Sequence, residues 1–232
     1  VGRWAVSLAY VSQQELIKCY DDYDFHKVVQ ILMNFCSIEL GSFYLDIIKD
    51  RQYTAKDNSA ARRSCQTALY KIAEALVRWI APILSFTAQE AWEQIPGKRD
   101  EFVFTQFWYD KLEKLDESSV FNSEFWQRML TFRNEANKAI ETARNNGVIG
   151  GSLEAVVNIY TKGQLLEDLR KLENELRFVL ITSKAIVSDA EAPADAIKSE
   201  TLDCAFTVTK SQAKKCERCW HYEDDVDSDP EY

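Results

Sequence analysis

The stretch DFHKVVQILMNFCSIELGSFYLDIIKD, residues 24–50, has an apolar side chain at nearly every third or fourth position. Steps of three and four residues return to the same face of an α-helix. The apolar face consists of Phe25, Val28, Val29, Leu32, Cys36, Leu40, Phe43 and Ile47. We therefore predict a long amphipathic helix whose apolar face packs against other helices.

Three further helical segments lie on either side of this stretch. Residues 4–20 form the first, and the tripeptide DNS at 57–59 offers an N-cap for the second, which Pro82 should kink or end. The apolar stripe of the second segment consists of Leu69, Ile72, Ala73, Leu76 and Ile80. The sequence TAQE at 87–90 resembles a capping box that opens a short helix ending near Pro96. Together these segments predict a four-helix bundle.

The hydrophobic period changes beyond the acidic stretch at residues 112–119. One more long helix comes first, with Gly147 as its C-terminal stop. Its apolar face consists of Phe125, Met129, Phe132, Ala136, Ile140 and Ala143. Strands are predicted at 153–160, 184–188 and 204–209. Residues 164–178 have a helical pattern and residues 189–199 that of a flexible loop, so the second half is a small α+β unit.

Composition and charge limit the class of protein. The chain has 232 residues, 46% of them hydrophobic, and can bury a sizeable core. It has neither an apolar run of about 18 residues nor a signal-peptide pattern, so we expect a soluble piece of a longer protein without a membrane partner. Lys and Arg number 28 against 37 Asp and Glu, a formal charge of −9, so any RNA site must be local.

Local basic clusters do occur in the sequence. The first contains Lys49, Arg51, Lys56, Arg62 and Arg63. The second contains Arg128, Arg133, Lys138 and Arg144, and the third contains Lys210, Lys214, Lys215 and Arg218. We interpret the second cluster as a solvated helix face rather than as an RNA site.

The cysteines indicate a reducing compartment and one metal-binding pattern. Six cysteines are too few for a disulfide framework in a chain of this length, which fits the cytoplasm, and Cys19, Cys36 and Cys65 fit small buried hydrophobes of helices. Cys216 and Cys219 have the spacing with which two thiolates hold one Zn²⁺ from a tight turn, and His221 offers at best a third ligand. Two alternatives stay open: a C-x-x-C redox pair and two unrelated buried cysteines.

Arg218 and Trp220 lie inside and directly after this cysteine pair. A small metal-stabilised turn has little core for an indole to join, so an exposed Trp beside an Arg suggests a platform on which an unpaired base stacks. The alternative is that Trp220 packs against the α+β unit.

Motifs of catalysis are absent from the sequence. Its two histidines, His26 and His221, form no short motif, and no G-x-x-x-x-G-K-[ST], G-x-G-x-x-G or G-x-S-x-G occurs. We expect no catalytic residue in this chain, and we assign His26 a structural role.

Four segments carry a resemblance to a known family. FYLDIIKDRQYTA at 43–55 and ARRSCQTALYKIAEALVRWIAPILSFTAQEAW at 61–92 resemble the helical anticodon-binding domain of the class I synthetases for isoleucine, valine and leucine. IGGSLEAVV at 149–157 resembles the junction after that domain, and KCERCWHY at 215–222 the C-terminal zinc module of bacterial isoleucyl-tRNA synthetases. The resemblance covers essentially the whole chain, and C-x-x-C-W favours the isoleucine enzymes over the valine enzymes, which end in a coiled coil.

The resemblance implies a mainly α fold in four parts. These are a helical anticodon-binding bundle at 1–116, a connecting helix at 117–150, a small α+β junction domain at 151–210 and the start of a zinc knuckle at 211–232. Cys216 and Cys219 match the first two of four zinc ligands, and the family's second C-x-x-C would follow a few residues past Tyr232. The signatures of the family's catalytic domain, H-I-G-H-like and K-M-S-K-S-like, have no counterpart here.

The resemblance also implies a partner, the anticodon stem-loop of isoleucine tRNA. Arg218 and Trp220 match the base-contacting position of the zinc module, and Lys49 and Arg51 are further candidates for RNA contacts. The alternative for Lys49 and Arg51 is ion pairing with Asp46 or Asp50. Full-length members activate isoleucine with ATP and Mg²⁺, transfer it to tRNA and hydrolyse mischarged valine; we expect a cytoplasmic monomer. A helical protein-interaction scaffold with an incidental zinc turn is the competing hypothesis.

Overall fold

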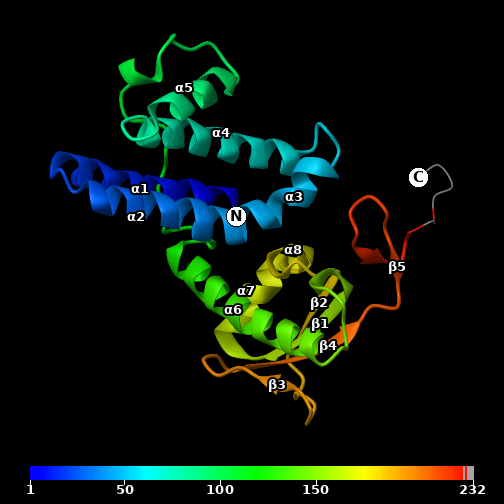
Figure 1. The fold of residues 1–232 in the computed structure, drawn as a ribbon. Helices are drawn as coiled ribbons and strands as arrows, with labels where there is room; N and C mark the ends of the chain where they lie inside the picture. Colours follow the sequence, from blue (N-terminus) through cyan, green and yellow to red (C-terminus); the bar gives the residue numbers. More distant parts are fainter. Residues whose placement is uncertain (227, 229–232) are drawn as a thin grey trace. The chain divides into compact units, whose positions relative to one another are not determined.

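The computed structural model describes residues 1–226 and 228 of the chain. They form two compact units, Val1–Asn122 and Ser123–Tyr232. The predicted fold class is confirmed, because the first unit is helical and the second combines helices with a small mixed sheet (Figure 1). The division of the chain into four parts stays a prediction.

The first unit is built from long helices that pack side by side. They are α1 (Gly2–Asp21), α2 (Phe25–Asn34), the π-helical η1 (Phe35–Tyr44), α3 (Leu45–Tyr53), α4 (Ala60–Ile80) and α5 (Ser85–Gln94), followed by the 3-10 turn η2 (Val103–Thr105). α1 packs along α4, while α2, η1 and α3 follow one another as one continuous helix (Figure 1).

The inward face of this continuous helix differs from the predicted stripe. Val28, Leu40, Phe43 and Ile47 are buried, as predicted. The predicted face is wrong for three residues that are exposed: Phe25, Val29 and Cys36. Phe35 and Tyr44 are buried instead, because the i→i+5 turns of the π-helix hold more residues than an α-turn and shift the inward face along the sequence. The prediction of buried thiols is confirmed for Cys19 and Cys65.

The same continuous helix, Phe25–Tyr53, is long and apolar enough to cross a membrane, with a mean hydropathy of 1.4 over its best window. This differs from the prediction that no such segment exists. Length and composition of this kind also fit the core helix of a soluble bundle. Seven of its aromatic and aliphatic side chains are buried in the first unit: Val28, Phe35, Leu40, Phe43, Tyr44, Ile47 and Ile48.

Trp79 on α4 anchors the core of the first unit. Its indole is fully buried, packs edge-on against Phe35 with ring centroids 5.2 Å apart, and donates a hydrogen bond of 2.9 Å to Oε1 of Gln13. The amide of Gln13 in turn donates to the carbonyl oxygen of Tyr109 at 2.8 Å. This buried chain of bonds ties α1 and the extended segment after η2 to α4.

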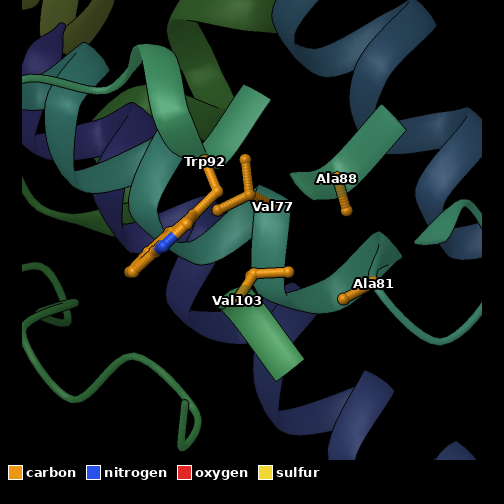
Figure 2. Packing of buried hydrophobic residues seen from close by; sticks show 5 residues of the cluster. All are labelled: Val77, Ala81, Ala88, Trp92 and Val103. Atoms are coloured by element: carbon orange, nitrogen blue, oxygen red, sulfur yellow. The ribbon is translucent and has the colours of Figure 1, made fainter. Parts of the chain in front are cut away.

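A smaller apolar cluster joins α4 to α5 and η2. It consists of Val77, Ala81, Ala88, Trp92 and Val103 (Figure 2). Beside it, Glu74 is 4% exposed and forms ion pairs with Arg78 at 2.6 Å and Arg99 at 2.8 Å. The guanidinium groups of both arginines lie over the Trp92 ring, so these two cations serve the packing of the unit.

The helix ends follow the local sequence with one correction. Ser59 caps α4 by accepting a hydrogen bond from the Arg62 N–H at 3.2 Å, and α4 ends at Ile80, two residues before Pro82. The predicted capping box at 87–90 is wrong, because α5 already begins at Ser85. The tight turn after Ile80, whose carbonyl oxygen accepts from Leu84 N–H at 2.7 Å, restarts the helix before the predicted box.

The second unit is a four-stranded sheet with helices and a small hairpin. In chain order its elements are α6 (Ser123–Asn145), η3 (Ser152–Glu154), β1 (Ala155–Thr161), α7 (Gly163–Leu172), η4 (Glu173–Glu175), α8 (Leu176–Leu180), β2 (Lys184–Ser188), β3 (Ile197–Lys198), β4 (Cys204–Lys210), β5 (Lys214–Lys215) and β6 (Tyr222–Glu223). The strand order is β2-β1-β4-β3, with β2 parallel and β4 antiparallel to β1, and β5 pairs with β6 in a separate ladder (Figure 1).

Helix α6 covers this sheet with the apolar face that the sequence predicted. All six predicted residues are buried, and Phe132 meets Phe206 of β4 with ring centroids 5.8 Å apart. Gly147 stops the helix at φ +72, and the N–H of Val148 bonds back to the carbonyl of Ala143 at 2.9 Å.

Three features of the second unit differ from the sequence-based prediction. The predicted helix at 164–178 is interrupted at Glu173, which has φ +46 and ψ −128. The predicted loop at 189–199 contributes the short strand β3, paired with β4. The hairpin of β5 and β6 was not predicted, because two-residue strands carry no readable alternation.

Candidate nucleic-acid interface

The cysteine pair lies in the loop of the hairpin formed by β5 and β6. Lys214 pairs with Glu223 and Lys215 with Tyr222, so residues 216–221 form the loop between the strands. The Cys216 N–H donates to the His221 carbonyl at 2.8 Å, and the Trp220 N–H donates to the Cys216 carbonyl at 2.9 Å. Trp220 has φ +65, a conformation rare for a bulky residue, so the loop doubles back sharply after Cys219.

The two thiols share this tight turn and are partly exposed. Backbone N–H groups of Cys219 and Arg218 hydrogen-bond to the sulfur of Cys216 and lower the pKa of its thiol. Donors directed at sulfur stabilise a thiolate, which is the protonation state that binds metal. The prediction of a turn that can present two thiolates to one ion therefore has a structural basis.

His221 is not placed as a third ligand of the cysteine pair. The His221 ring is 4% exposed and lies edge-on against Phe178, with centroids 5.7 Å apart. Within residues 1–226 and 228, no group of three His, Cys, Asp or Glu side chains is placed to hold a metal ion. The described residues thus fit two corners of a tetrahedral zinc site.

Arg218 and Trp220 are both exposed on the loop. The Trp220 side chain is 61% exposed, so it does not pack into the α+β unit, and this alternative is wrong. Lys215 places its Nζ 5.4 Å from the centroid of the Trp220 ring. An exposed aromatic ring close to a cation is a combination that can stack on an unpaired base and attract its phosphate. The sequence places Lys215 in a basic cluster, but no sequence pattern indicates its contact with Trp220.

Lys49 and Arg51 lie on α3 in the first unit, whereas the hairpin belongs to the second unit. Lys49 is 65% exposed and forms an ion pair with Asp46 at 2.6 Å, which raises the pKa of Lys49. Arg51 is half-buried, and its charge opposes part of the rise that burial causes in the pKa of Tyr44. The ion-pair alternative therefore holds for Lys49, although an exposed pair of this kind is weak and can open to a phosphate.

The second basic cluster is structural. Arg128 pairs with the fully buried Asp168 at 2.7 Å, and Nε of Arg133 donates to the Val179 carbonyl at 3.0 Å. Lys138 binds Glu135 at 2.7 Å. Arg128 and Arg133 hold α6 to its neighbours, so the interpretation of a solvated helix face is wrong for these two. It agrees with the exposed side chains of Lys138 and Arg144.

Comparison with known proteins identifies the family. A family model described as the anticodon-binding domain of tRNA ligase matches residues 2–159, more than half of the chain. The chain belongs to this family. The match covers the helical first unit and extends through α6 to β1, so the anticodon-binding domain includes the helix that leads into the sheet.

Relatives with more than half of their aligned residues identical to this chain are isoleucine–tRNA ligases. That of Shewanella piezotolerans is 57% identical over 227 residues, which cover 97% of this chain and 24% of the relative. That of Pectobacterium carotovorum is 55% identical over 233 residues, 100% of this chain and 25% of the relative. The chain therefore spans about a quarter of the length of the relatives it matches, and the similarity includes the hairpin as well as the bundle.

Proposed function

We propose that this chain reads the anticodon loop of isoleucine tRNA as part of an isoleucine–tRNA ligase. The observation that carries the proposal is the exposed indole of Trp220, held beside Lys215 and Arg218 on a tight cysteine turn, in a chain of the anticodon-binding family. Unpaired bases of an RNA loop are recognised by stacking on such aromatic faces and by hydrogen bonds to their edges. Because the chain as a whole is acidic, attraction of the RNA phosphates must come from a local group of cations such as this one.

The four proposed RNA-binding residues have different roles. Trp220 stacks on an anticodon base, and Arg218 hydrogen-bonds to a base edge or stacks beside it. Lys49 and Arg51 bind backbone phosphates, which fixes the register of the RNA without reading its sequence. Salt weakens such phosphate contacts, because RNA binding releases condensed counterions.

Zinc is the proposed cofactor of the loop. Cys216 and Cys219 would hold the ion as thiolates, and the remaining ligands would come from outside the described residues. Bound zinc supplies a structural cross-link that fixes the loop carrying Arg218 and Trp220. We expect a strong chelator to weaken RNA binding by loosening residues 216–220, and unchanged affinity after metal removal would contradict this role.

The chemistry of the longer ligase lies outside this chain. We propose that the whole protein attaches isoleucine to its tRNA with ATP and Mg²⁺ in the cytoplasm, as a monomer, and that none of the residues described here acts on the reacting groups. Anticodon binding by this chain orients the tRNA, so it contributes to specificity through affinity rather than through the chemical step.

The direct test is a titration with two tRNAs. Labelled isoleucine tRNA, with valine tRNA as the control, is titrated with zinc present into the chain and into a chimaeric ligase, in which this chain replaces the matching residues of the Shewanella piezotolerans enzyme. We expect the chimaeric ligase to prefer isoleucine tRNA by about tenfold or more, a difference of about 1.4 kcal/mol. Equal affinity for the two tRNAs would overturn the assignment of anticodon reading.

A protein-interaction scaffold is the second candidate function. It is supported by large apolar side chains on the surface of the first unit, among them Phe86 at 88% and Phe107 at 91% exposure. Salt separates the two functions. RNA binding through phosphates weakens steeply as salt rises, whereas contacts between apolar surfaces do not.

A further inference from the structure

The hairpin of β5 and β6 is too small to hold its own position. Each strand contributes two residues, and an isolated two-stranded hairpin is marginally stable even at greater length. Its loop carries the exposed Trp220. Whatever fixes the hairpin on the second unit therefore also fixes the position of that indole.

Apolar packing under the hairpin is incomplete. A cavity of about 500 Å³ lies between the hairpin and the sheet edge, lined by Lys184, Ala185 and Ile186 on β2 and by Tyr222 and Glu223 on β6. A hairpin beside an open, partly polar cavity has few apolar contacts to define its angle. Polar contacts at its second strand must supply that definition.

Tyr222 makes two such contacts. Its backbone N–H donates to Oγ of Ser183 at 2.6 Å, and its phenolic hydroxyl donates to Oε1 of Glu154 at 3.2 Å. Ser183 is 2% exposed and donates its own proton to the Leu153 carbonyl at 2.5 Å, so the hydroxyl has a fixed orientation. The partners lie 39 and 68 residues from Tyr222 in the sequence.

Glu154 is held firmly enough to serve as an anchor. Its carboxylate accepts from the Gly150 N–H at 2.8 Å and pairs with Lys210 at 3.2 Å, in addition to Tyr222. The Gly150 N–H and Lys210 lower the pKa of Glu154, so it is ionised at neutral pH. A charged acceptor roughly doubles the strength of a hydrogen bond from a phenol.

Glu223 forms the third contact, an ion pair with Arg177 on α8. Nη1 of Arg177 also approaches the Ser183 carbonyl at 3.4 Å, and its guanidinium lies 4.8 Å from the centroid of the Phe178 ring. Phe178 packs in turn against His221, the residue between Trp220 and Tyr222. Glu154 and Ser183 thus hold Tyr222, and Arg177 holds Glu223, so two consecutive positions of β6 are fixed by contacts with the rest of the second unit.

We propose that Glu154, Arg177 and Ser183 are positioning residues for RNA recognition: they dock β6 on the second unit and so set where Arg218 and Trp220 meet the anticodon loop. The inference rests on the proposed function of those two residues. Docking of β6 depends on these protein contacts rather than on the metal. Zinc fixes the loop at 216–220, and the three residues fix the hairpin that carries the loop. Trp220 follows the movement of Tyr222, because only His221 separates them and Trp220 is bonded back to Cys216.

Docking itself is tested on the chain by hydrogen exchange. We expect the Tyr222 amide to be protected in the wild type with and without a zinc chelator, and to exchange about tenfold faster in Arg177→Glu, because a lost contact of about 1.4 kcal/mol is tenfold in an equilibrium. Combining Arg177→Glu with Glu223→Arg restores the pair with reversed charges and should restore protection. Protection that falls with the chelator to the level of Arg177→Glu would show that zinc, not the three residues, docks β6.

The effect on RNA is tested in the chimaeric ligase by aminoacylation. Arg177→Glu should raise KM for isoleucine tRNA about tenfold with kcat unchanged, and the charge-reversed double variant should recover the wild-type KM. Arg170→Glu is the matched control, because Arg170 forms an exposed pair with Asp189 at 3.3 Å in the same unit. A merely structural role would lower the unfolding midpoint and the amount of folded enzyme, and would leave KM of the folded enzyme unchanged.

A variant that lacks both base-contacting side chains separates the positioning role from the base-reading function. If Arg218→Ala combined with Trp220→Ala raises KM, a further Arg177→Glu change should add nothing, because the positioned residues are gone. An additive effect would overturn the positioning role alone. An unchanged KM in the Arg218→Ala and Trp220→Ala variant would instead overturn the base-reading function.

Discussion

The helical bundle and the hairpin of β5 and β6 differ in how they place their basic residues. In the bundle, Arg78 and Arg99 are turned inward, pair with the buried Glu74 and stack on Trp92. In the hairpin, Arg218 and Trp220 point to solvent, and polar contacts from Tyr222 and Glu223 hold the strand that follows them.

This difference shows that stability and recognition reside in different parts of the molecule. Buried aromatic side chains stabilise the bundle, and Lys71, Arg78 and Arg99 form ion pairs within the unit. The hairpin contributes little apolar burial and leaves a cation and an indole accessible. Substitutions in the bundle should therefore act on unfolding, and substitutions in the loop on RNA affinity.

Replacing Trp79 is the most severe test of this separation. Trp79→Ala removes a fully buried indole and leaves the side-chain Oε1 of Gln13 without its donor, so we expect a loss of about 3–5 kcal/mol in the free energy of unfolding. Trp220→Ala is the control and should change stability by less than about 0.5 kcal/mol, because that indole is exposed. Urea unfolding followed by circular dichroism measures both, and equal losses would contradict the separation.

A charged pair of the second unit gives the next largest effect. Arg128→Met leaves the buried Asp168 carboxylate with only Lys171 and Gln164, and we expect about 2 kcal/mol of destabilisation, reduced because Arg128 is itself 30% exposed. Arg144→Met is the matched control, since its pair with Glu141 is exposed on both sides and should matter by less than about 1 kcal/mol. Similar urea midpoints for the two variants would show that burial of Asp168 is unimportant.

The loop residues should show the reverse behaviour. Arg218→Ala and Trp220→Ala in the chimaeric ligase should each weaken binding of isoleucine tRNA by about 1–3 kcal/mol, the usual size of a base contact or a stacked base. Phe107→Ala is a control that removes an exposed aromatic from the first unit. Wild-type affinity in both loop variants, with intact unfolding curves, would remove them from the interface.

Acid should weaken the second unit through Glu135. Its carboxylate accepts from Lys138, Ser199 and the Glu200 N–H, which lower the pKa of Glu135 to about 2. Because this folded pKa lies below the unfolded value of about 4.3, the stabilisation is complete above about pH 4.3 and is lost as pH falls towards 2. Urea midpoints across this range should fall less steeply for Glu135→Gln, and parallel curves for variant and wild type would exclude Glu135 as the cause.

Lys49 should give the smallest effect. Lys49→Ala breaks an exposed pair with Asp46 and should cost less than about 1 kcal/mol of stability. The slope of log RNA affinity against log salt concentration should become shallower by about one, because one phosphate contact is lost. Asp46→Asn is the control, because it breaks the same pair and leaves the cation free for phosphate. If Lys49 serves only the ion pair, neither variant will change RNA binding.

The sequence predicted elements more reliably than faces and contacts. The six apolar residues of α6 and the bounds of β2 agree with the structure because each is a regular local pattern. The predicted burial of Cys36 is wrong because the π-helix changes the helical period, and no local sequence pattern indicates that change. Trp220 could be recognised as a candidate from its place after C-x-x-C, but its 61% exposure and its contact with Lys215 could not.

By itself the sequence determined the mainly α class, the cysteine turn and the resemblance to anticodon-binding domains, since these depend on periodicity and on residues close together in the chain. Only the tertiary structure decided that His221 faces Phe178 and that Glu154 and Ser183 hold Tyr222. The reason is physical: a hydrogen bond between residues 39 or 68 positions apart exists only once the sheet has brought them together. No sequence pattern at Tyr222 indicates that Ser183 or Glu154 is its partner.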